Sequence, residues 1–206
     1  MSEQPRSTAS RPYRMRKRAE QVEETRQRIV DAAVDLHTTT GPADTTISAI
    51  AGQAGVTRLT VYRHFPDTES LFTACARRWS ERHPAPDPAT WRAIPDLEER
   101  ARRALRELYA WYDECGDGLL AIMRDREAMP RSTREETDAE FRALADALVV
   151  GTGVRGRARR RLRATAGLLV SIWTWQSLTV EEGLTTHDAA ELGVSLLTCA
   201  ARRPVR

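Results

Sequence analysis

Apolar residues recur at intervals of three and four along most of this chain, and the pattern is interrupted where Gly and Pro occur. This spacing puts apolar side chains on one face of an α-helix, whereas a half-buried strand would show strict alternation. We therefore expect an all-α protein. The expected helices are residues 19–38, a segment opening after Thr45 or Thr46, residues 58–65, a segment opening after Asp67, and residues 96–115, 119–128, 132–150, 155–180 and 187–202.

Closely spaced prolines between residues 84 and 95 make the clearest break in the helical pattern. Proline has no amide donor and disfavours helix at the residue before it, so this stretch is predicted to be a connection. We expect a domain boundary there. One helical domain would cover residues 19–83 and a second would cover residues 84–206, with residues 1–18 separate from both.

Two short expected helices meet at Gly55 in the segment TTISAIAGQAGVTRLTVYRHF, which occupies residues 45–65. Gly tolerates the left-handed backbone that such a turn uses. Thr57 can cap the second helix, and the small side chains of Ala51 and Ala54 allow the helices to cross closely. We therefore expect a helix-turn-helix. Its small core would consist of Ile47, Ile50, Val61 and Phe65. The positions left facing outward are Arg58, Leu59, Thr60, Tyr62, Arg63 and His64.

The outward side chains of this second helix suit DNA. Arg can pair with guanine through two hydrogen bonds in the major groove, Leu can contact the methyl group of thymine, and Thr, Tyr and His can bind phosphates. The alternative is an ordinary helical hairpin with a solvated face. An exposed Leu59 between polar neighbours, with a basic segment nearby, favours DNA binding.

Positive charge is concentrated in the first part of the chain. The net charge is only +3, and residues 1–83 carry the whole excess, with 13 Lys and Arg against 10 Asp and Glu. Residues 1–18 contain a cluster of basic residues and a single acidic residue, Glu3, and the segment also contains Pro and Ser. Such a cluster predicts a flexible basic arm, with a solvated tail as the alternative. Its basic residues are Arg6, Arg11, Arg14, Arg16, Lys17 and Arg18.

Four short motifs within residues 20–75 resemble the N-terminal signature of TetR-type transcription regulators. They are Ile50-Ala51, Ala54-Gly55-Val56-Thr57, Val61-Tyr62-Arg63-His64-Phe65 and Glu69-x-Leu71. The resemblance implies an N-terminal three-helix helix-turn-helix domain that binds double-stranded DNA. It also implies that residues 84–206 form a C-terminal helical domain that binds a small-molecule effector and dimerises.

The resemblance also assigns roles to residues, position by position. It implies phosphate contacts by Thr57, Tyr62 and His64, and base or groove contacts by Arg58, Leu59, Thr60 and Arg63. Thr46 and Thr68 complete the helix-turn-helix candidates. Many members carry Lys where this chain has Thr68 beside two acidic residues, so a weaker phosphate anchor is expected there. The arm residues Arg14, Arg16, Lys17 and Arg18 would offset that loss by reaching the neighbouring minor groove.

The segment 164–180 is apolar on most sides rather than along one stripe. A helix of that kind must be covered on most sides, so we expect one side to pack on its own domain and another to meet a second subunit together with the last helix. A membrane-surface helix is less favoured because this segment has no belt of Lys or Arg. The candidate interface residues are Leu169, Ile172, Leu192 and Leu196.

Aromatic and Met side chains of the second domain could line an effector pocket between helices. The candidates are Trp91, Tyr109, Trp111, Tyr112, Met123, Met129, Phe141 and Trp173. They do not distinguish a drug-like, acyl or aromatic effector, and most aromatic residues of this kind are ordinary core residues.

Catalytic, metal and cofactor sites are not expected. The four His are scattered, and Cys75, Cys115 and Cys199 are odd in number and widely separated. Neither pattern has metal-ligand or disulfide spacing. No run of about 18 uncharged apolar residues and no signal peptide is present, so we expect a cytoplasmic protein that does not enter membranes.

These patterns favour a homodimeric repressor that a small-molecule effector releases from a palindromic operator. One alternative is a DNA-binding regulator that has no effector or that activates transcription. A more distant alternative is a helical enzyme or binding protein with a vestigial helix-turn-helix.

Overall fold

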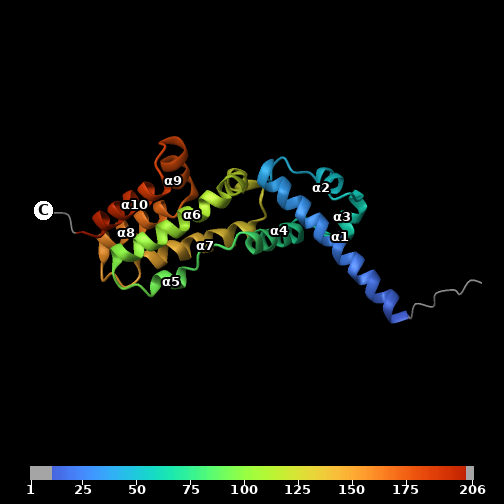
Figure 1. The fold of residues 1–206 in the computed structure, drawn as a ribbon, viewed down its shortest axis with the longest axis horizontal. Coiled ribbons are helices and arrows are strands. Elements are labelled where there is room, and N and C mark those ends of the chain that lie inside the picture. The colour runs from blue at the N-terminus through green and yellow to red at the C-terminus, as the bar shows by residue number, and fades with distance from the viewer. Residues whose placement is uncertain (1–10, 203–206) are drawn as a thin grey trace, which may run out of the picture.

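The computed structural model describes residues 11–202, and in that range it contains helices and no strand, which confirms the all-α fold class. The N-terminal helices are α1 (Arg11–Thr39), α2 (Ile47–Gln53), α3 (Arg58–His64) and α4 (Thr68–Arg82). The C-terminal helices are α5 (Pro88–Arg92), α6 (Leu97–Arg124), α7 (Arg131–Val149), α8 (Gly156–Leu169), α9 (Ile172–Gln176) and α10 (Thr186–Ala201). The molecule is elongated, with the N-terminal helices at one end and α5 to α10 at the other (Figure 1).

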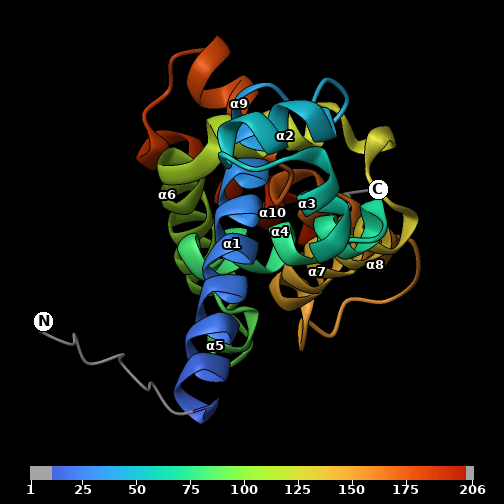
Figure 2. The ribbon, with the colours of Figure 1, turned by 90° about the vertical axis from the view of Figure 1, so that its right-hand side faces the viewer.

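The first helix begins earlier than the sequence pattern predicted. α1 starts at Arg11 rather than at residue 19, so the second part of the expected flexible arm is helical, while residues 1–10 lie outside the described residues. The segment 14–28 consists mainly of strong helix formers such as Arg, Lys, Glu and Gln, and Arg16 pairs with Glu20 one turn later at 3.3 Å. The first turns of α1 project beyond the helices around them (Figure 2).

Two other expected helix boundaries were wrong. Residues 97–124 form one continuous helix, because Gly116 lies inside α6 where the ring of Trp175 packs against it. Conversely, the expected helix 155–180 ends at Leu169 and restarts at Ile172. At this break the hydroxyl of Tyr109 donates to the Leu169 carbonyl at 3.1 Å, and that of Tyr112 donates to the Val170 carbonyl at 2.7 Å. Side chains of α6 thus satisfy carbonyls that a continuing helix would have used.

The apolar interior is divided into two parts. One buried cluster joins α1 to α4 and includes Ile29, Ile50 and Val61. The larger cluster joins α5 to α10 and includes Leu108 and Leu162. The partly buried ring of Trp79 packs against both clusters, so α4 connects the two ends of the molecule.

A polar junction also connects the two ends. The Asp125 carboxylate, at the end of α6, accepts a hydrogen bond from the Ala43 amide at 3.1 Å, and Arg124 donates to the Thr40 carbonyl at 2.9 Å. Hydrogen bonds from Arg124 and then from Ala43 hold the pKa of Asp125 below its ordinary value. Gly41 lies in this loop with φ of +100°, and a Cβ there would stand 2.1 Å from the Asp125 carboxylate. The loop before α2 therefore rests directly on the end of α6.

Gly41→Ala should destabilise the protein by about 1–3 kcal/mol, because Ala disfavours positive φ and its methyl group would displace Asp125 from the Ala43 amide. Thermal unfolding measures the effect. Gly52→Ala is the matched control, since Gly52 lies inside α2 and has no neighbouring atom within 4 Å of the added methyl group. This control should stabilise by roughly 0.5–1 kcal/mol. Equal stability of the two variants would contradict the account of the junction.

Candidate functional site

The helix-turn-helix is built on two threonine caps. The Thr46 hydroxyl accepts from the Ala49 amide at 3.1 Å and so fixes the start of α2. The Thr57 hydroxyl accepts from the Thr60 amide at 3.2 Å, which confirms Thr57 as the cap of α3. Because each cap satisfies an amide that the helix leaves free, the two short helices begin at defined residues.

One face of α3 is buried and holds the helix in place. Val61 is fully buried, Phe65 is 3% exposed, and Ile50 of α2 packs in the same cluster. α1 supports this arrangement from outside, because the Arg26 guanidinium lies 4.8 Å from the centre of the Phe65 ring and Arg28 donates to the Ala54 carbonyl at the turn. These contacts therefore hold α3 in place against α1 and α2.

The opposite face of α3 is open. Leu59 is 71% exposed and Tyr62 is 46% exposed, although both are large and carry apolar surface. Arg58 and Arg63 are also exposed, and their guanidinium groups form no ion pair within residues 11–202. Thr60 and His64 are half-buried at the edge of this face. The predicted DNA-contacting residues of α3 thus share one accessible surface.

The flanking candidates lie at helix starts. Thr46 and Thr57 are exposed caps, and Thr68 is the exposed first residue of α4. Asp67 caps α4 by accepting from the Ser70 amide at 2.7 Å, and this hydrogen bond holds the pKa of Asp67 below its ordinary value. The ionised Asp67 carboxylate beside Thr68 repels phosphate, which is a physical reason to expect a weak anchor there.

The basic candidates at the start of the chain lie on the first turns of α1. Arg14, Arg16, Lys17 and Arg18 are all exposed on the projecting part of this helix (Figure 1). They form a helical basic surface rather than a flexible arm, whereas Arg6 lies outside the described residues.

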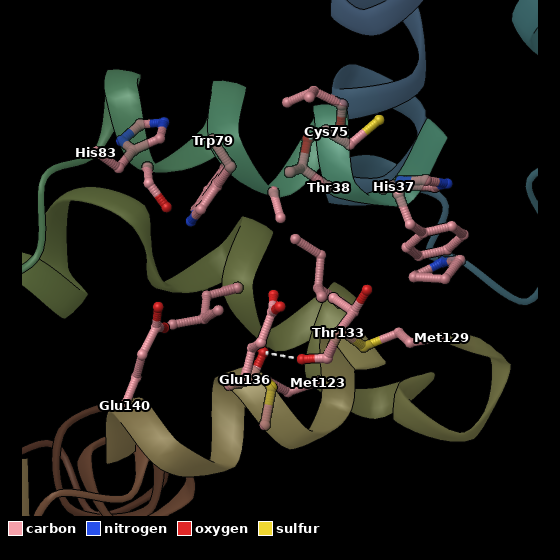
Figure 3. A pocket seen from close by; sticks show the side chains of 18 of the residues that line it. His37, Thr38, Cys75, Trp79, His83, Met123, Met129, Thr133, Glu136 and Glu140 are labelled. Atoms are coloured by element: carbon pink, nitrogen blue, oxygen red, sulfur yellow. Dashed lines mark hydrogen bonds between the residues drawn. The ribbon is translucent and has the colours of Figure 1, made fainter. Parts of the chain in front are cut away.

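A cavity lies between α1, α4, α6 and α7, at the contact of the two ends of the molecule (Figure 3). Its volume, counted as the space open to the centres of water-sized molecules, is about 160 Å³. Four of the predicted effector residues are in its wall. They are Trp111, Met123, Met129 and Phe141.

The other four predicted effector residues do not line this cavity. Trp91, Tyr109 and Tyr112 are fully buried in the C-terminal core. Their polar atoms are used internally: the indole of Trp91 donates to Glu107 at 2.6 Å, and the two tyrosines bind the carbonyls at the end of α8. Trp173 is 45% exposed and borders a separate hollow. These four assignments are corrected accordingly.

Sequence reasoning missed the part of the wall that α1 and α4 supply, because it searched for the pocket only within residues 84–206. His37 and Trp79 are examples from this side, and Glu136 and Glu140 of α7 face them across the cavity (Figure 3). A signal was present at His37, which continues the buried face of α1 formed by residues such as Ala33. A polar residue on an apolar helix face indicates either a core side chain that is hydrogen-bonded inside the protein or a ligand-binding site.

Two of the four predicted interface residues are inside the protomer. Leu169 is fully buried and Ile172 is 1% exposed, so neither can face a second subunit, and both assignments were wrong. Leu192 and Leu196 on α10 are 40% and 44% exposed, and Leu168 on α8 is 58% exposed. Consecutive helix residues differ by about 100° in direction, so Leu168 points outward where Leu169 points inward.

No helix between residues 11 and 202 is long and apolar enough to cross a membrane. The same range holds no group of three or more His, Cys, Asp or Glu that could bind a metal ion.

The helix-turn-helix segment is similar to segments of known proteins. Residues 29–75 match the family described as "Bacterial regulatory proteins, tetR family", and this segment contains α2 and α3. The chain is also similar to the HTH-type transcriptional regulator SrpR of Pseudomonas putida, with 54% identity over 50 residues, 24% of this chain and 24% of SrpR. The match to this relative thus spans about a quarter of its length.

Solved structures share the fold beyond the helix-turn-helix. A tetR-family transcriptional regulator from Streptomyces coelicolor superposes with a TM-score of 0.57 and 24% identity, over 86% of this chain and 79% of that one. NalD, the secondary repressor of the MexAB-OprM multidrug efflux pump in Pseudomonas aeruginosa, superposes with a TM-score of 0.56 and 23% identity, over 90% of this chain and 100% of NalD. The segment that contains the helix-turn-helix is therefore similar to bacterial regulatory proteins of the tetR family, and the chain shares the fold of these two solved regulators.

Proposed function

We propose that this protein is a homodimeric transcription repressor of the bacterial cytoplasm that binds a palindromic operator and leaves it when a small molecule binds. The observation that carries the proposal is the open face of α3, where Leu59 is 71% exposed between Arg58 and Arg63 on a helix whose other face is buried. We propose binding rather than catalysis as its chemistry.

An α-helix of this kind fits the major groove of DNA, with its N-terminal residues nearest the bases. In this arrangement Arg58, Leu59, Thr60 and Arg63 contact base edges. The hydroxyl or imidazole groups of Thr46, Thr57, Tyr62, His64 and Thr68 contact phosphates. Base contacts supply sequence preference, whereas phosphate contacts fix the position of the helix.

A dimer is proposed because one short helix contacts too few bases for useful specificity. Leu168, Leu192 and Leu196 supply an exposed apolar surface on α8 and α10, two helices that pack together. A two-fold dimer formed through this surface would carry two copies of α3, and its operator would have matching symmetry.

The cavity supports the effector part of the proposal. Its wall combines residues of α1 and α4 with residues of α6 and α7, so a ligand there contacts both ends of the molecule. A ligand changes a conformational equilibrium only by binding one state better than the other, and a site between two moving parts allows such a difference. The role of NalD as a repressor supports the proposed direction of regulation.

Leu59→Ala and Tyr62→Phe should have different effects on DNA binding. Loss of the Leu59 side chain relaxes base preference at one position, whereas loss of the Tyr62 hydroxyl weakens binding to all sequences alike. Each change should cost at most about 1–3 kcal/mol. Binding to a panel of operator variants separates the two effects, with Val150→Ala as a control that keeps the base preference, because Val150 is 43% exposed and lies outside α3 and outside the proposed dimer surface. If Leu59→Ala weakens every sequence equally, Leu59 is not a base contact.

A further inference from the structure

The cavity between α1, α4, α6 and α7 has two unpartnered polar side chains in its wall. His37 is 5% exposed and Thr133 is 6% exposed. Neither the His37 ring nitrogens nor the Thr133 hydroxyl forms a hydrogen bond with another group in residues 11–202. Burial lowers the pKa of His37 to about 4, so the ring is neutral at physiological pH and has one donor and one acceptor. Within the described residues the enclosed side-chain polar atom without a partner is Arg134 Nε, so the polar atoms of His37 and Thr133 stay accessible although the rest of each side chain is buried, and a ligand in the cavity can bind them.

Aromatic rings form much of the remaining wall. Phe72 stacks on His37 with ring centres 4.6 Å apart, and Trp111 and Phe141 also line the space. Trp79 points into it from α4 (Figure 3). Flat apolar surfaces on several sides favour a flat apolar ligand, and indole faces additionally attract positive charge. A cavity of about 150 Å³ accepts a benzene ring. The similar volume of this cavity, about 160 Å³, therefore suits a small aromatic ligand.

Among the Asp, Glu, Lys and Arg residues, only carboxylates line the described wall of the cavity. Most acidic residues of α7 pair with an arginine, but Glu136 and Glu140, which line the cavity, have no ion-pair partner in the described part of the chain. The paired residues are Arg131–Glu135, Arg126–Asp138 and Arg163–Asp146. The chain contains 32 Lys and Arg, and none of those within residues 11–202 lines the cavity.

The two carboxylates disfavour each other's charge. Both side chains are exposed at the edge of the cavity, and partial burial, followed by the charge of Glu136, raises the pKa of Glu140. A bound cation would relieve both effects, since an opposite charge favours the ionised carboxylate. A bound anion would add a third negative charge to a site whose wall holds two carboxylates and no Lys or Arg, which disfavours fatty acids and aromatic acids as ligands.

We propose that this cavity binds a small aromatic organic cation, with its flat body among the aromatic rings and its positive charge beside Glu136 and Glu140. Binding itself is independent of DNA, whereas the effect of the ligand on DNA rests on the proposed repressor function. The inference thus gives the chemical class of the proposed effector.

The test compares three probes of similar shape in the full-length protein: N-methylquinolinium as the cation, quinoline as the neutral molecule at mildly alkaline pH, and 1-naphthoate as the anion. Titration calorimetry measures affinity, and quenching of tryptophan emission reports occupancy because Trp79 and Trp111 line the cavity. The cation should bind roughly tenfold more tightly than quinoline, and naphthoate should bind most weakly.

Glu140→Gln and Glu136→Gln should each reduce this preference for the cation by roughly three- to tenfold and leave quinoline affinity unchanged, because the substitution removes charge but little shape. Glu135→Gln is the matched control on the same helix, since Glu135 pairs with Arg131 and does not line the cavity. Thermal unfolding shows whether each variant is folded.

Each outcome decides one claim. Preference for the cation that both cavity variants lose and Glu135→Gln keeps would support the site. Equal or tighter binding of quinoline or naphthoate, or an unchanged preference in both cavity variants, would overturn it. Binding of the cation as expected, without any weakening of operator affinity, would leave the site standing and would reject only the effector role.

Discussion

Leu196→Glu should convert the dimer into monomers and weaken operator binding by on the order of 100-fold. Leu196 is 44% exposed in the protomer, on the face of α10 that we assign to the dimer contact. Two copies would bring unpaired carboxylates into a dehydrated interface, which costs several kcal/mol. A monomer presents only one copy of α3, so the second half of the operator contributes nothing to the binding affinity.

Sedimentation velocity measures the oligomeric state of this variant, and gel shifts measure its affinity for DNA. Val150→Glu is the matched control, because Val150 is 43% exposed but follows α7 and belongs to neither α8 nor α10. Leu169→Glu should behave differently from both and unfold the protein, since Leu169 is fully buried. A Leu196→Glu protein that remains dimeric and binds DNA normally would place the interface elsewhere.

Replacing the basic residues Arg14, Arg16, Lys17 and Arg18 together by Gln should flatten the salt dependence of DNA binding. Each neutralised phosphate contributes about 0.9 to the slope of log affinity against log salt, so roughly two to four contacts contribute about 2 to 3.5. At low salt the affinity should fall by on the order of 10- to 100-fold.

Loss of folding would not explain such a result. Gln is nearly as good a helix former as Arg and Lys, and loss of the exposed Arg16–Glu20 pair costs only about 0.3–0.5 kcal/mol, so the replacement should change the stability of α1 little. The matched control replaces Arg155, Arg157, Arg159 and Arg160, which are exposed at the start of α8, and should leave the slope unchanged. An unchanged slope in the α1 variant would show that this surface does not touch DNA.

Local sequence signals predicted the helix-turn-helix well because its determinants are local. Threonine caps, a glycine at the turn and apolar spacing all lie within 21 residues. The start of α1 was misplaced because a cluster of like charge was weighted above the helix propensity of the same residues. The cluster is exposed, so its repulsion is screened by solvent and does not prevent the helix.

The remaining errors depend on contacts between distant residues. The end of α8 is set by Tyr109 and Tyr112, which lie 60 and 58 residues before the carbonyls that they bind. Which of Leu168 and Leu169 faces inward depends on the helices packed against α8, and apolar spacing does not distinguish them because neighbouring residues are also apolar. The cavity draws its wall from four helices, and a search confined to one domain could recover only part of it.

The central claim is that α3 contacts DNA bases as half of a two-fold dimer, and selection of bound sequences from random double-stranded DNA at moderate salt tests it most directly. We expect enrichment of a palindromic site whose two halves match, with a thymine position that loses its preference in the Leu59→Ala protein. Recovery of a pool without any shared motif, bound no more tightly than random DNA, would contradict the account.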